Sequence, residues 1–176
     1  MKIGIDIDNV IADTFKDLIP YYNKFMGKEE TPQEVIETMR RRKLLMMRYY
    51  LNAWRKRVMT KVSLINGAAE TIQNWHGDHQ IKLVTSRWTM FNRQTRWWLN
   101  QHSIPYHELH HAKEKTKYQK AANCSLFIED NPEECKILAN YCERVFLFDQ
   151  PWNRHFIAQK NIIRVRNWEE ISDLNK

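Results

Sequence analysis

Short apolar segments alternate with amphipathic segments along most of this chain, and this alternation limits the possible folds more than any other feature. The apolar segments are rich in Ile, Leu, Val and Phe, as the buried strands of parallel sheets are. Four clear ones span residues 2–7, 81–85, 125–128 and 144–148, and two weaker ones span residues 106–109 and 162–165. Amphipathic segments lie between them, at about 68–75, 93–102, 116–122 and 132–141. The pattern predicts an α/β fold in which helices cover both faces of a parallel sheet.

The stretch from residue 14 to about residue 62 interrupts this alternation. It contains no strand-like segment, and its pattern predicts two or three helices inserted after the first strand. Apolar residues recur there at intervals of three and four, as on one face of a helix: Leu44, Met47, Leu51, Trp54 and Val58. We expect this stripe to be packed against other parts of the protein. The domains predicted are a core, residues 1–13 and 63–176, and a helical cap, residues 14–62.

The positive charge of the chain is concentrated in the same stretch. The net charge is +7, from 28 Lys/Arg and 21 Asp/Glu, and residues 14–62 hold 12 of the basic and 5 of the acidic residues. The rest of the chain therefore holds 16 of each, and the whole excess (12 minus 5) lies in the inserted stretch. Arg41, Arg48 and Arg55, spaced seven apart, are predicted to flank the apolar stripe and to be the arginines able to turn toward the cleft.

Several classes of protein are disfavoured by composition. No segment approaches the roughly 18 apolar residues that span a membrane, and acidic residues stand where a signal peptide needs its apolar region. We therefore expect a cytoplasmic protein with no membrane partner. The chain has three cysteines, an odd number without a CxxC pair, so free buried thiols are expected.

Two carboxylates, Asp6 and Asp8, come at the end of the first predicted strand. Residues i and i+2 of a strand point to the same side, so both carboxylates could face one site. Ligands of open parallel sheets bind beyond the carboxyl ends of the strands, where this pair lies. Two carboxylates there can hold a hard cation such as Mg²⁺. One can also attack phosphorus while the other handles the proton of the leaving group.

Polar residues follow two other predicted strands. The second strand ends in Thr85 and Ser86, whose hydroxyl and backbone N–H groups suit phosphate oxygens at a strand-to-helix turn. The fourth strand ends in Glu129 and Asp130. Next to the first pair of carboxylates, these acids would repel one another strongly unless a cation neutralised them. The sequence therefore predicts a magnesium site at this edge of the sheet.

A lysine-rich stretch and a helix start complete the pattern. One lysine of Lys113-Glu114-Lys115-Thr116-Lys117 is expected to neutralise a transferring phosphoryl group, and the other two are expected to be solvated. After the fourth strand, Asn131 suits an N-cap and Pro132 the first helical position, while Glu134 is expected to complete a capping box.

The order of these motifs resembles the haloacid dehalogenase superfamily from residue 2 to about residue 153. An Asp-x-Asp motif, a Thr/Ser pair, a lysine and an acidic pair follow one another, each at a strand end or just before a helix. More narrowly, DIDNVIAD, LVTSR, KEKT, FIEDNPE and the later LFDQPWNR are similar to the 5'(3')-deoxyribonucleotidase-like branch. The resemblance implies a Rossmann-like core with a small helical cap inserted after strand one, in agreement with the stretch described above.

The resemblance also implies a magnesium-dependent phosphomonoesterase that acts through an aspartyl-phosphate. Asp6 would be the nucleophile and Asp8 the general acid/base. Magnesium would be held by Asp6, the backbone carbonyl of Asp8, and Asp130.

Phosphate would be bound by Thr85 and Ser86, and Lys115 in KEKT would stabilise the phosphoryl group, with Lys117 as the alternative lysine. The chain departs from the family pattern at Asn9, where many relatives carry Gly, and at Glu129, which replaces the first of two Asp residues.

Three functions remain open from the sequence. The first is a phosphatase for a small phosphomonoester, with a (deoxy)nucleoside monophosphate as the leading substrate. The second is a nucleic-acid-binding module or nucleic-acid-end phosphatase, because residues 38–61 hold nine Lys/Arg and no acid, interleaved with Tyr49, Tyr50 and Trp54. The third, a catalytically silent scaffold, is disfavoured because every residue that the chemistry needs is present.

Overall fold

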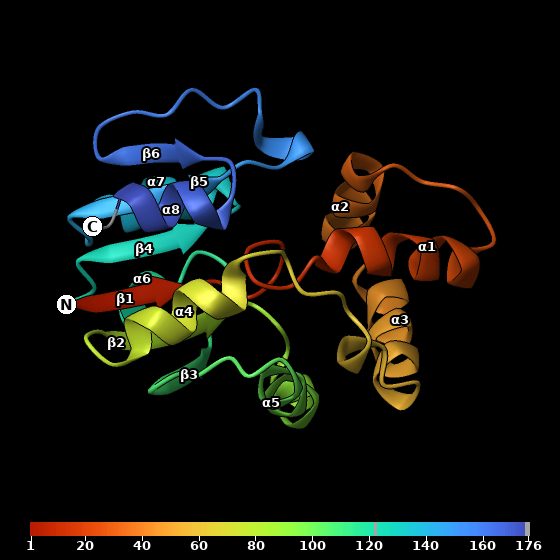
Figure 1. Ribbon diagram of the computed structural model, residues 1–176. Helices are drawn as coiled ribbons and strands as arrows, with labels where there is room; N and C mark the ends of the chain where they lie inside the picture. Colours follow the sequence, from red (N-terminus) through yellow and green to blue (C-terminus); the bar gives the residue numbers. More distant parts are fainter. Residues whose placement is uncertain (122, 175–176) are drawn as a thin grey trace.

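A six-stranded parallel sheet forms the centre of the computed structural model, which describes residues 1–121 and 123–174 (Figure 1). The strand order is β3-β2-β1-β4-β5-β6, and every neighbouring pair is parallel. The strands are β1 (Lys2–Ile5), β2 (Gln80–Thr85), β3 (Glu108–His111), β4 (Leu126–Glu129), β5 (Arg144–Phe148) and β6 (Ile162–Val165). The predicted parallel α/β architecture is confirmed.

Helices cover both faces of this sheet. Helices α4 (Ala68–His76) and α8 (Trp168–Leu174) contact each other on one face, and α6 (Tyr118–Ala121) and α7 (Pro132–Leu138) cover the opposite face (Figure 1). Strand residues alternate accordingly between two apolar clusters: Ile3, Ile5 and Ile128 belong to the cluster with α4 and α8, whereas Phe127, Val145 and Leu147 belong to the one with α6 and α7. This period of two explains why the strands are apolar on both sides.

Gly4 shows how closely neighbouring strands pack on the second face. It lies opposite Phe127 in the β1–β4 register, and a Cβ atom at Gly4 would stand 2.2 Å from the Phe127 ring. The aromatic ring thus fills the space that a side chain on β1 would need.

Element boundaries differ from the expectation at several places. β1 ends at Ile5, so Asp6 and Ile7 follow the strand, and β3 begins at Glu108 instead of residue 106. Helix α8 was not predicted from the sequence. The predicted helix 116–122 corresponds to α6, and its residue 122 lies outside the described residues. The remaining helix of the core, α5 (Asn92–Gln101), packs against the 3-10 helix η1 (Val58–Thr60).

Three helices, α1 (Thr14–Met26), α2 (Pro32–Arg41) and α3 (Lys43–Arg55), lie between β1 and β2 in the chain and to one side of the sheet (Figure 1). A capping box between Thr31 and Glu34, with Pro32 at the first helical position, starts α2. The three helices share a small apolar cluster of their own, centred on Tyr22, Val35, Met46 and Tyr49. We call residues 14–62 the helical insertion.

The predicted packing of the apolar stripe on α3 is wrong. Leu44 is 78% exposed, and Met47, Leu51 and Trp54 are between 43% and 45% exposed. The helix instead buries Met46, Tyr49 and Ala53, which recur at the same helical intervals on a neighbouring face. Because α3 carries two apolar faces, its sequence period could not decide which face would be covered.

Two backbone hydrogen bonds join the connections of the insertion to each other. Asp13 N donates to Ser63 O at 2.8 Å, and Ile65 N donates to Ile11 O at 2.8 Å. The chain thus leaves and re-enters the core at one place. We call these paired segments, residues 11–13 and 63–65, the connector.

None of the described helices combines the length and the apolar composition that crossing a bilayer requires. The three cysteines are free and buried, as expected.

Candidate active site

The candidate site lies where the strand order reverses, between β1 and β4. Asp6 directly follows β1 and Asp130 directly follows β4, and both side chains are buried. Asp6 N donates to Ile128 O at 2.9 Å, which keeps the loop after β1 beside β4. The adjacent ends of these two strands therefore bring together two acids that are 124 residues apart (130 minus 6).

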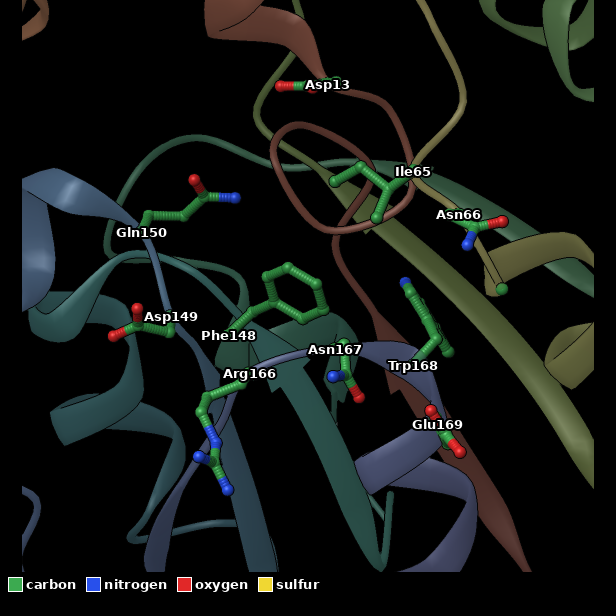
Figure 2. Close-up of a pocket in the computed structure, with 11 residues that line it drawn as sticks. Asp13, Ile65, Asn66, Phe148, Asp149, Gln150, Arg166, Asn167, Trp168 and Glu169 are labelled. Atoms are coloured by element: carbon green, nitrogen blue, oxygen red, sulfur yellow. The ribbon is translucent and has the colours of Figure 1, made fainter.

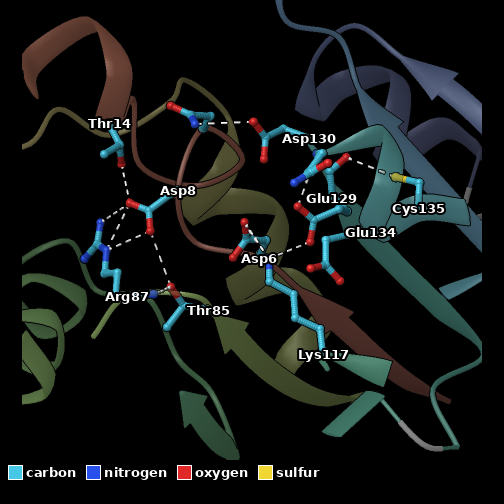
Figure 3. A network of polar contacts seen from close by, with 12 residues as sticks. Asp6, Asp8, Thr14, Thr85, Arg87, Lys117, Glu129, Asp130, Glu134 and Cys135 are labelled. Carbon is cyan, nitrogen blue, oxygen red and sulfur yellow. Dashed lines mark hydrogen bonds and ion pairs between the residues drawn. The ribbon is translucent and has the colours of Figure 1, made fainter. Parts of the chain in front are cut away.

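Lys117 is the lysine at this site. Its Nζ atom lies 3.0 Å from Asp6 Oδ2 and 2.7 Å from Glu129 Oε2, and its side chain is buried (Figure 3). Lys115, which the sequence favoured, is exposed. The expectation that Lys115 lies at the site is therefore wrong, and the alternative, Lys117, contacts the acids instead.

The turn before Lys117 explains this outcome. Lys115 has a left-handed backbone with φ 63°, and its N–H donates to the buried carboxylate of Glu134. The turn directs the side chain of Lys115 to solvent and brings Lys117 to the start of α6. Glu134 thus fixes the lysine loop, and it does not complete the predicted capping box.

Glu129 takes the place of Glu134 in the cap. Asn131 N donates to Glu129 Oε1 at 3.2 Å, and Asn131 Oδ1 accepts from Glu133 N at 3.0 Å. Since the other oxygen of Glu129 pairs with Lys117, both oxygens of this carboxylate already have partners. The structure therefore assigns Glu129 to holding the lysine and the start of α7.

Burial and mutual repulsion raise the pKa values of the acids in this cluster. The pKa of Asp6 is raised by burial and then by the charge of Glu129, although Lys117 opposes both. Burial first, and the charge of Asp6 second, raise the pKa of Asp130 to about 7, and burial likewise raises the pKa of Glu129 to about 7. Burial works against the charge of Lys117, but Asp6 and Glu129 outweigh it and raise its pKa. One ammonium group does not neutralise three carboxylates.

The cluster fits a divalent cation. Asp6, Glu129 and Asp130 each offer an oxygen within 4.8 Å of the others. Asp6 Oδ1 is buried and has no hydrogen-bond partner among the described residues. The hydrogen bonds to the Asp130 carboxylate, from Asn9 Nδ2 at 3.3 Å and Trp152 Nε1 at 3.1 Å, both go to Oδ2. Oxygen from Asp6 and from Asp130 is therefore available to a hard cation.

Asp8 belongs to a separate group of contacts (Figure 3). Arg87 donates to both of its oxygens, at 2.8 to 3.1 Å, while Thr14 and Thr85 donate hydroxyl hydrogen bonds at 2.5 Å and 3.3 Å. Burial disfavours the charge on Asp8, but the Arg87 guanidinium and the Thr14 hydroxyl outweigh it and lower the pKa of Asp8. The carboxylates of Asp6 and Asp8 thus share the site but have different partners.

The predicted phosphate-binding pair is divided in a similar way. Thr85 is fully buried, and its hydroxyl bonds Asp8 and accepts from Arg87 N at 3.1 Å. Ser86 is partly exposed beyond the end of β2. Thr85 is therefore engaged in holding Asp8, and Ser86 is the more accessible hydroxyl.

The sequence contained signals for residues that we did not assign to the site. Arg87 directly follows the Thr/Ser pair, and Trp152 lies in the late segment LFDQPWNR. Asn153 anchors that segment: its Nδ2 atom donates to Asp130 O and to Phe148 O, both at 2.8 Å, and its Oδ1 accepts from Arg164. A sequence pattern does not reveal these contacts, because they depend on how β6 and the segments that follow β4 and β5 fold against one another.

Aromatic rings from the insertion and the core lie near the carboxylates. The Tyr50 ring on α3 is 4.7 Å from the Trp88 ring, and the Phe15 ring on α1 is 4.6 Å from the Trp152 ring. Burial raises the pKa of Tyr50 to about 12, with a further contribution from the charge of Asp8. Tyr50 thus contacts Trp88, the residue that directly follows Arg87. Arg41 is paired with Glu37 within α2, and Arg48 and Arg55 line a shallow groove with Phe25, Leu51 and Asn52.

A hollow of about 400 Å³ lies beside the connector (Figure 2). Asp13 and Ile65 border it from the connector, and Phe148, Gln150 and Trp168 border it from the core. The catalytic candidates do not line it. Trp168 Nε1 donates to Val10 O at 2.8 Å, so the wall of this hollow is tied to the loop after β1.

Comparisons with known proteins agree with this geometry. A nucleotidase of Clostridium acetobutylicum is 28% identical, over 97% of this chain and 91% of that protein. A haloacid-dehalogenase-like hydrolase of Streptococcus pneumoniae has the same fold, with a TM-score of 0.71 at 9% identity over 98% of this chain and 97% of that chain. YfnB of Bacillus subtilis, a haloacid-dehalogenase-type protein solved bound to magnesium, gives a TM-score of 0.67 at 14% identity over 98% and 97%.

The family model described as "5' nucleotidase, deoxy (Pyrimidine), cytosolic type C protein" matches residues 1–175, nearly the whole chain. The predicted likeness to 5'(3')-deoxyribonucleotidase-like proteins is confirmed, and with it the class of phosphoric monoester hydrolase. The solved haloacid-dehalogenase-type structures share the fold. The chain belongs to this nucleotidase family.

Proposed function

We propose that the protein is a magnesium-dependent nucleotidase that hydrolyses a (deoxy)nucleoside 5'-monophosphate through an aspartyl-phosphate on Asp6. The observation that carries the proposal is the environment of Asp6. This buried carboxylate has one oxygen held by Lys117 and one oxygen without a partner, at the edge of the sheet where the strand order reverses.

The first step would form the aspartyl-phosphate. An Asp6 oxygen attacks phosphorus, the bond from phosphorus to the ester oxygen breaks, and Asp8 gives a proton to the departing nucleoside. In the second step Asp8 takes a proton from water, the water oxygen attacks phosphorus, and the bond to Asp6 breaks to release phosphate. Arg87 favours the ionised Asp8 that the second step needs, and the arrival of a phosphate dianion raises the pKa of Asp8 for the first step.

Lys117, Ser86 and a bound Mg²⁺ would bind or orient the phosphoryl group. Lys117, whose Nζ atom lies 3.0 Å from Asp6 Oδ2, would offset negative charge that develops beside Asp6, and Ser86 would offer a hydroxyl at the end of β2. Asp6, Asp130 and the backbone carbonyl of Asp8 would hold Mg²⁺, which supplies charge neutralisation when it is bound.

The substrate assignment rests on the rings at the site and on the family. Tyr50 with Trp88, and Phe15 with Trp152, offer flat apolar surfaces near the carboxylates, which suit a nucleobase. In each pair one ring comes from the helical insertion and the other from the core. This supports the proposal that residues 14–62 act as a cap over the core formed by residues 1–13 and 63–176.

Replacement of Asp6 by Asn tests the nucleophile. An amide cannot form an acyl-phosphate, so turnover of a deoxynucleoside monophosphate should fall to background, while the circular dichroism spectrum and melting temperature stay close to those of the wild type. Beryllium fluoride should stabilise the wild type and not Asp6→Asn. Substantial turnover by the variant would exclude Asp6 as the nucleophile, and full wild-type activity in excess EDTA would exclude the metal.

A second candidate function, action on nucleic-acid ends, is favoured by one observation. The exposed apolar face of α3 lies beside exposed Arg48 and Arg55, and such a surface could hold a single strand. Comparing kcat/KM for a deoxynucleoside monophosphate and a 5'-phosphorylated oligonucleotide separates the two. We expect the mononucleotide to be preferred, and a clear preference for the oligonucleotide with a steep salt dependence would favour the second function.

A further inference from the structure

The side chain of Asn9 connects two parts of the molecule that act differently in the proposed reaction. Asn9 lies in the loop after β1, is 4% exposed, and has a left-handed backbone with φ 60°. Its Oδ1 atom accepts from Phe15 N, in the first turn of α1, at 2.9 Å. Its Nδ2 atom donates to Asp130 Oδ2 at 3.3 Å. The side-chain amide of Asn9 thus bonds both to the first turn of α1, where the helical insertion begins, and to an acid of the core.

Trp152 connects the same two parts by a second route. Its Nε1 atom donates to Asp130 Oδ2 at 3.1 Å, and its ring lies 4.6 Å from the ring of Phe15. Phe15, Asn9, Asp130 and Trp152 therefore form a closed circuit of contacts. We call these four residues the Asn9 circuit.

The circuit also fixes which oxygen of Asp130 is free. Both donors bind Oδ2, so the carboxylate is held by one oxygen while the other remains available next to Asp6. A ligand oxygen that is held in place binds a cation with less loss of conformational freedom than a mobile one. A change in the position of the first turn of α1 would alter the Phe15–Asn9 bond and the Phe15–Trp152 contact, and with them the hold on Asp130.

We propose that Asn9 and Trp152 are positioning residues that couple cation binding at Asp130 to the placement of α1. The proposal rests on the proposed function, because it concerns the cation that the nucleotidase reaction would use. Coupling of this kind is reciprocal. If the position of α1 seen here raises the affinity for the cation, a bound cation stabilises this position of α1 by the same factor.

The choice of residue at position 9 follows from these contacts. Asn and Gly tolerate the left-handed backbone better than other residues do. Only Asn among these two offers an acceptor to Phe15 N and a donor to Asp130. An Asp at this position would retain the acceptor but would place a further negative charge against Asp130.

Calorimetric titration of the whole protein with Mg²⁺, without substrate, tests the positioning role. Asn9→Gly keeps a backbone suited to φ 60° but loses both side-chain hydrogen bonds, and Trp152→Phe keeps a ring but loses the N–H donor. Each variant should weaken Mg²⁺ binding about tenfold, about 1.4 kcal/mol. Because both donors share one oxygen, the double variant should deviate from the product of the single effects.

The chain offers matched controls. Asn123 is exposed and has φ 67°, so Asn123→Gly repeats the Asn-to-Gly change at a left-handed position away from the site. Trp97 on α5 is 50% exposed, so Trp97→Phe repeats the second change on the surface. Both controls should bind Mg²⁺ as the wild type does.

Hydrogen exchange measures the coupling itself. Mg²⁺ should slow exchange at Phe15 and the following amides of α1 in the wild type, and this slowing should be lost in Asn9→Gly even at saturating Mg²⁺. Unchanged Mg²⁺ affinity in Asn9→Gly and Trp152→Phe, or equal protection of α1 in wild type and Asn9→Gly, would overturn the proposal. If the wild type shows neither Mg²⁺ binding nor Mg²⁺-dependent turnover, the proposed function fails as well. If turnover depends on Mg²⁺ but the variants bind Mg²⁺ as the wild type does, the coupling is rejected and the proposed function stands.

Discussion

Two lysines separated by one residue have opposite surroundings in this protein. Lys117 is buried between Asp6 and Glu129, whereas Lys115 is exposed and contributes its backbone N–H to Glu134. Removing one partner from a buried ion pair leaves the other charges without compensation, which is costly. We therefore expect substitution of Lys115 to affect activity and stability much less than substitution of Lys117.

Replacement of Lys117 by Ala should lower kcat for a deoxynucleoside monophosphate by roughly 10²–10³-fold, because the lost ammonium group would act on charge developing in the transition state. Lys115→Ala, the matched control, should retain kcat within a few-fold. Circular dichroism and the melting temperature of both variants distinguish loss of chemistry from loss of fold. Equal effects of the two substitutions on kcat would contradict the placement of Lys117.

At the scale of elements, the sequence predicted the sheet well because buried parallel strands are short segments rich in Ile, Leu, Val and Phe. β5 and β6 begin and end at the predicted residues, and β2 and β4 do so within one residue. The site was predictable as far as it depends on strand ends, which carry Asp6, Thr85 and Asp130. The buried face of α3 was not, since Leu44 and Met46 belong to two equally periodic sets. Arg87, Asn9 and Trp152 meet their partners only through tertiary structure.

The contact between β1 and β4 at Gly4 gives a prediction about stability. Gly4→Ala should lower the free energy of unfolding by about 1–3 kcal/mol, because the new methyl group would overlap the ring of Phe127. Gly77→Ala is the matched control: no heavy atom lies within 4 Å of a Cβ built at Gly77, and its backbone is helical. That variant should be as stable as the wild type or slightly more stable.

Urea unfolding of both variants measures these differences. Phe127→Leu in the Gly4→Ala background should recover part of the lost stability, since a smaller side chain leaves room for the methyl group. A Gly4→Ala protein as stable as Gly77→Ala would show that the strands move apart at little cost.

At the scale of the whole molecule, charge is unevenly distributed. The basic excess lies in residues 14–62, and buried acids crowd the edge of the sheet. The pKa values of Glu129 and Asp130, about 7 in the fold, lie above the ordinary values of 4.5 and 3.8. Carboxyl groups with raised pKa values stabilise the fold below their ordinary pKa values, and this contribution is lost as the pH rises through about 7.

A cation should reverse that loss. Melting temperatures measured without Mg²⁺ should fall between about pH 4 and pH 7, from the ordinary pKa values of the two acids to their values in the fold. Saturating Mg²⁺ should raise the melting temperature more at about pH 8 than at about pH 5, where protons compete for Asp130. The raised pKa of Lys117 keeps this group charged across the window, so it does not confound the comparison. Asp130→Asn should remove most of the Mg²⁺-dependent difference. An equal gain from Mg²⁺ at both pH values would argue against the acid cluster as the binding site.

The connector has a consequence for how such a protein can change over evolutionary time. Because Asp13 and Ser63 are hydrogen-bonded neighbours, the insertion begins and ends at one point, as a loop on a hairpin does. Lengthening, shortening or exchanging the helices between these residues need not alter the strand register or the spacing of Asp6, Lys117 and Asp130. Under the proposed function, in which the insertion contacts the substrate and Asp6 carries the reaction, substrate preference and chemistry would therefore be inherited separately. A different set of helices on the same connector would then give the same phosphoryl chemistry access to a different class of molecules.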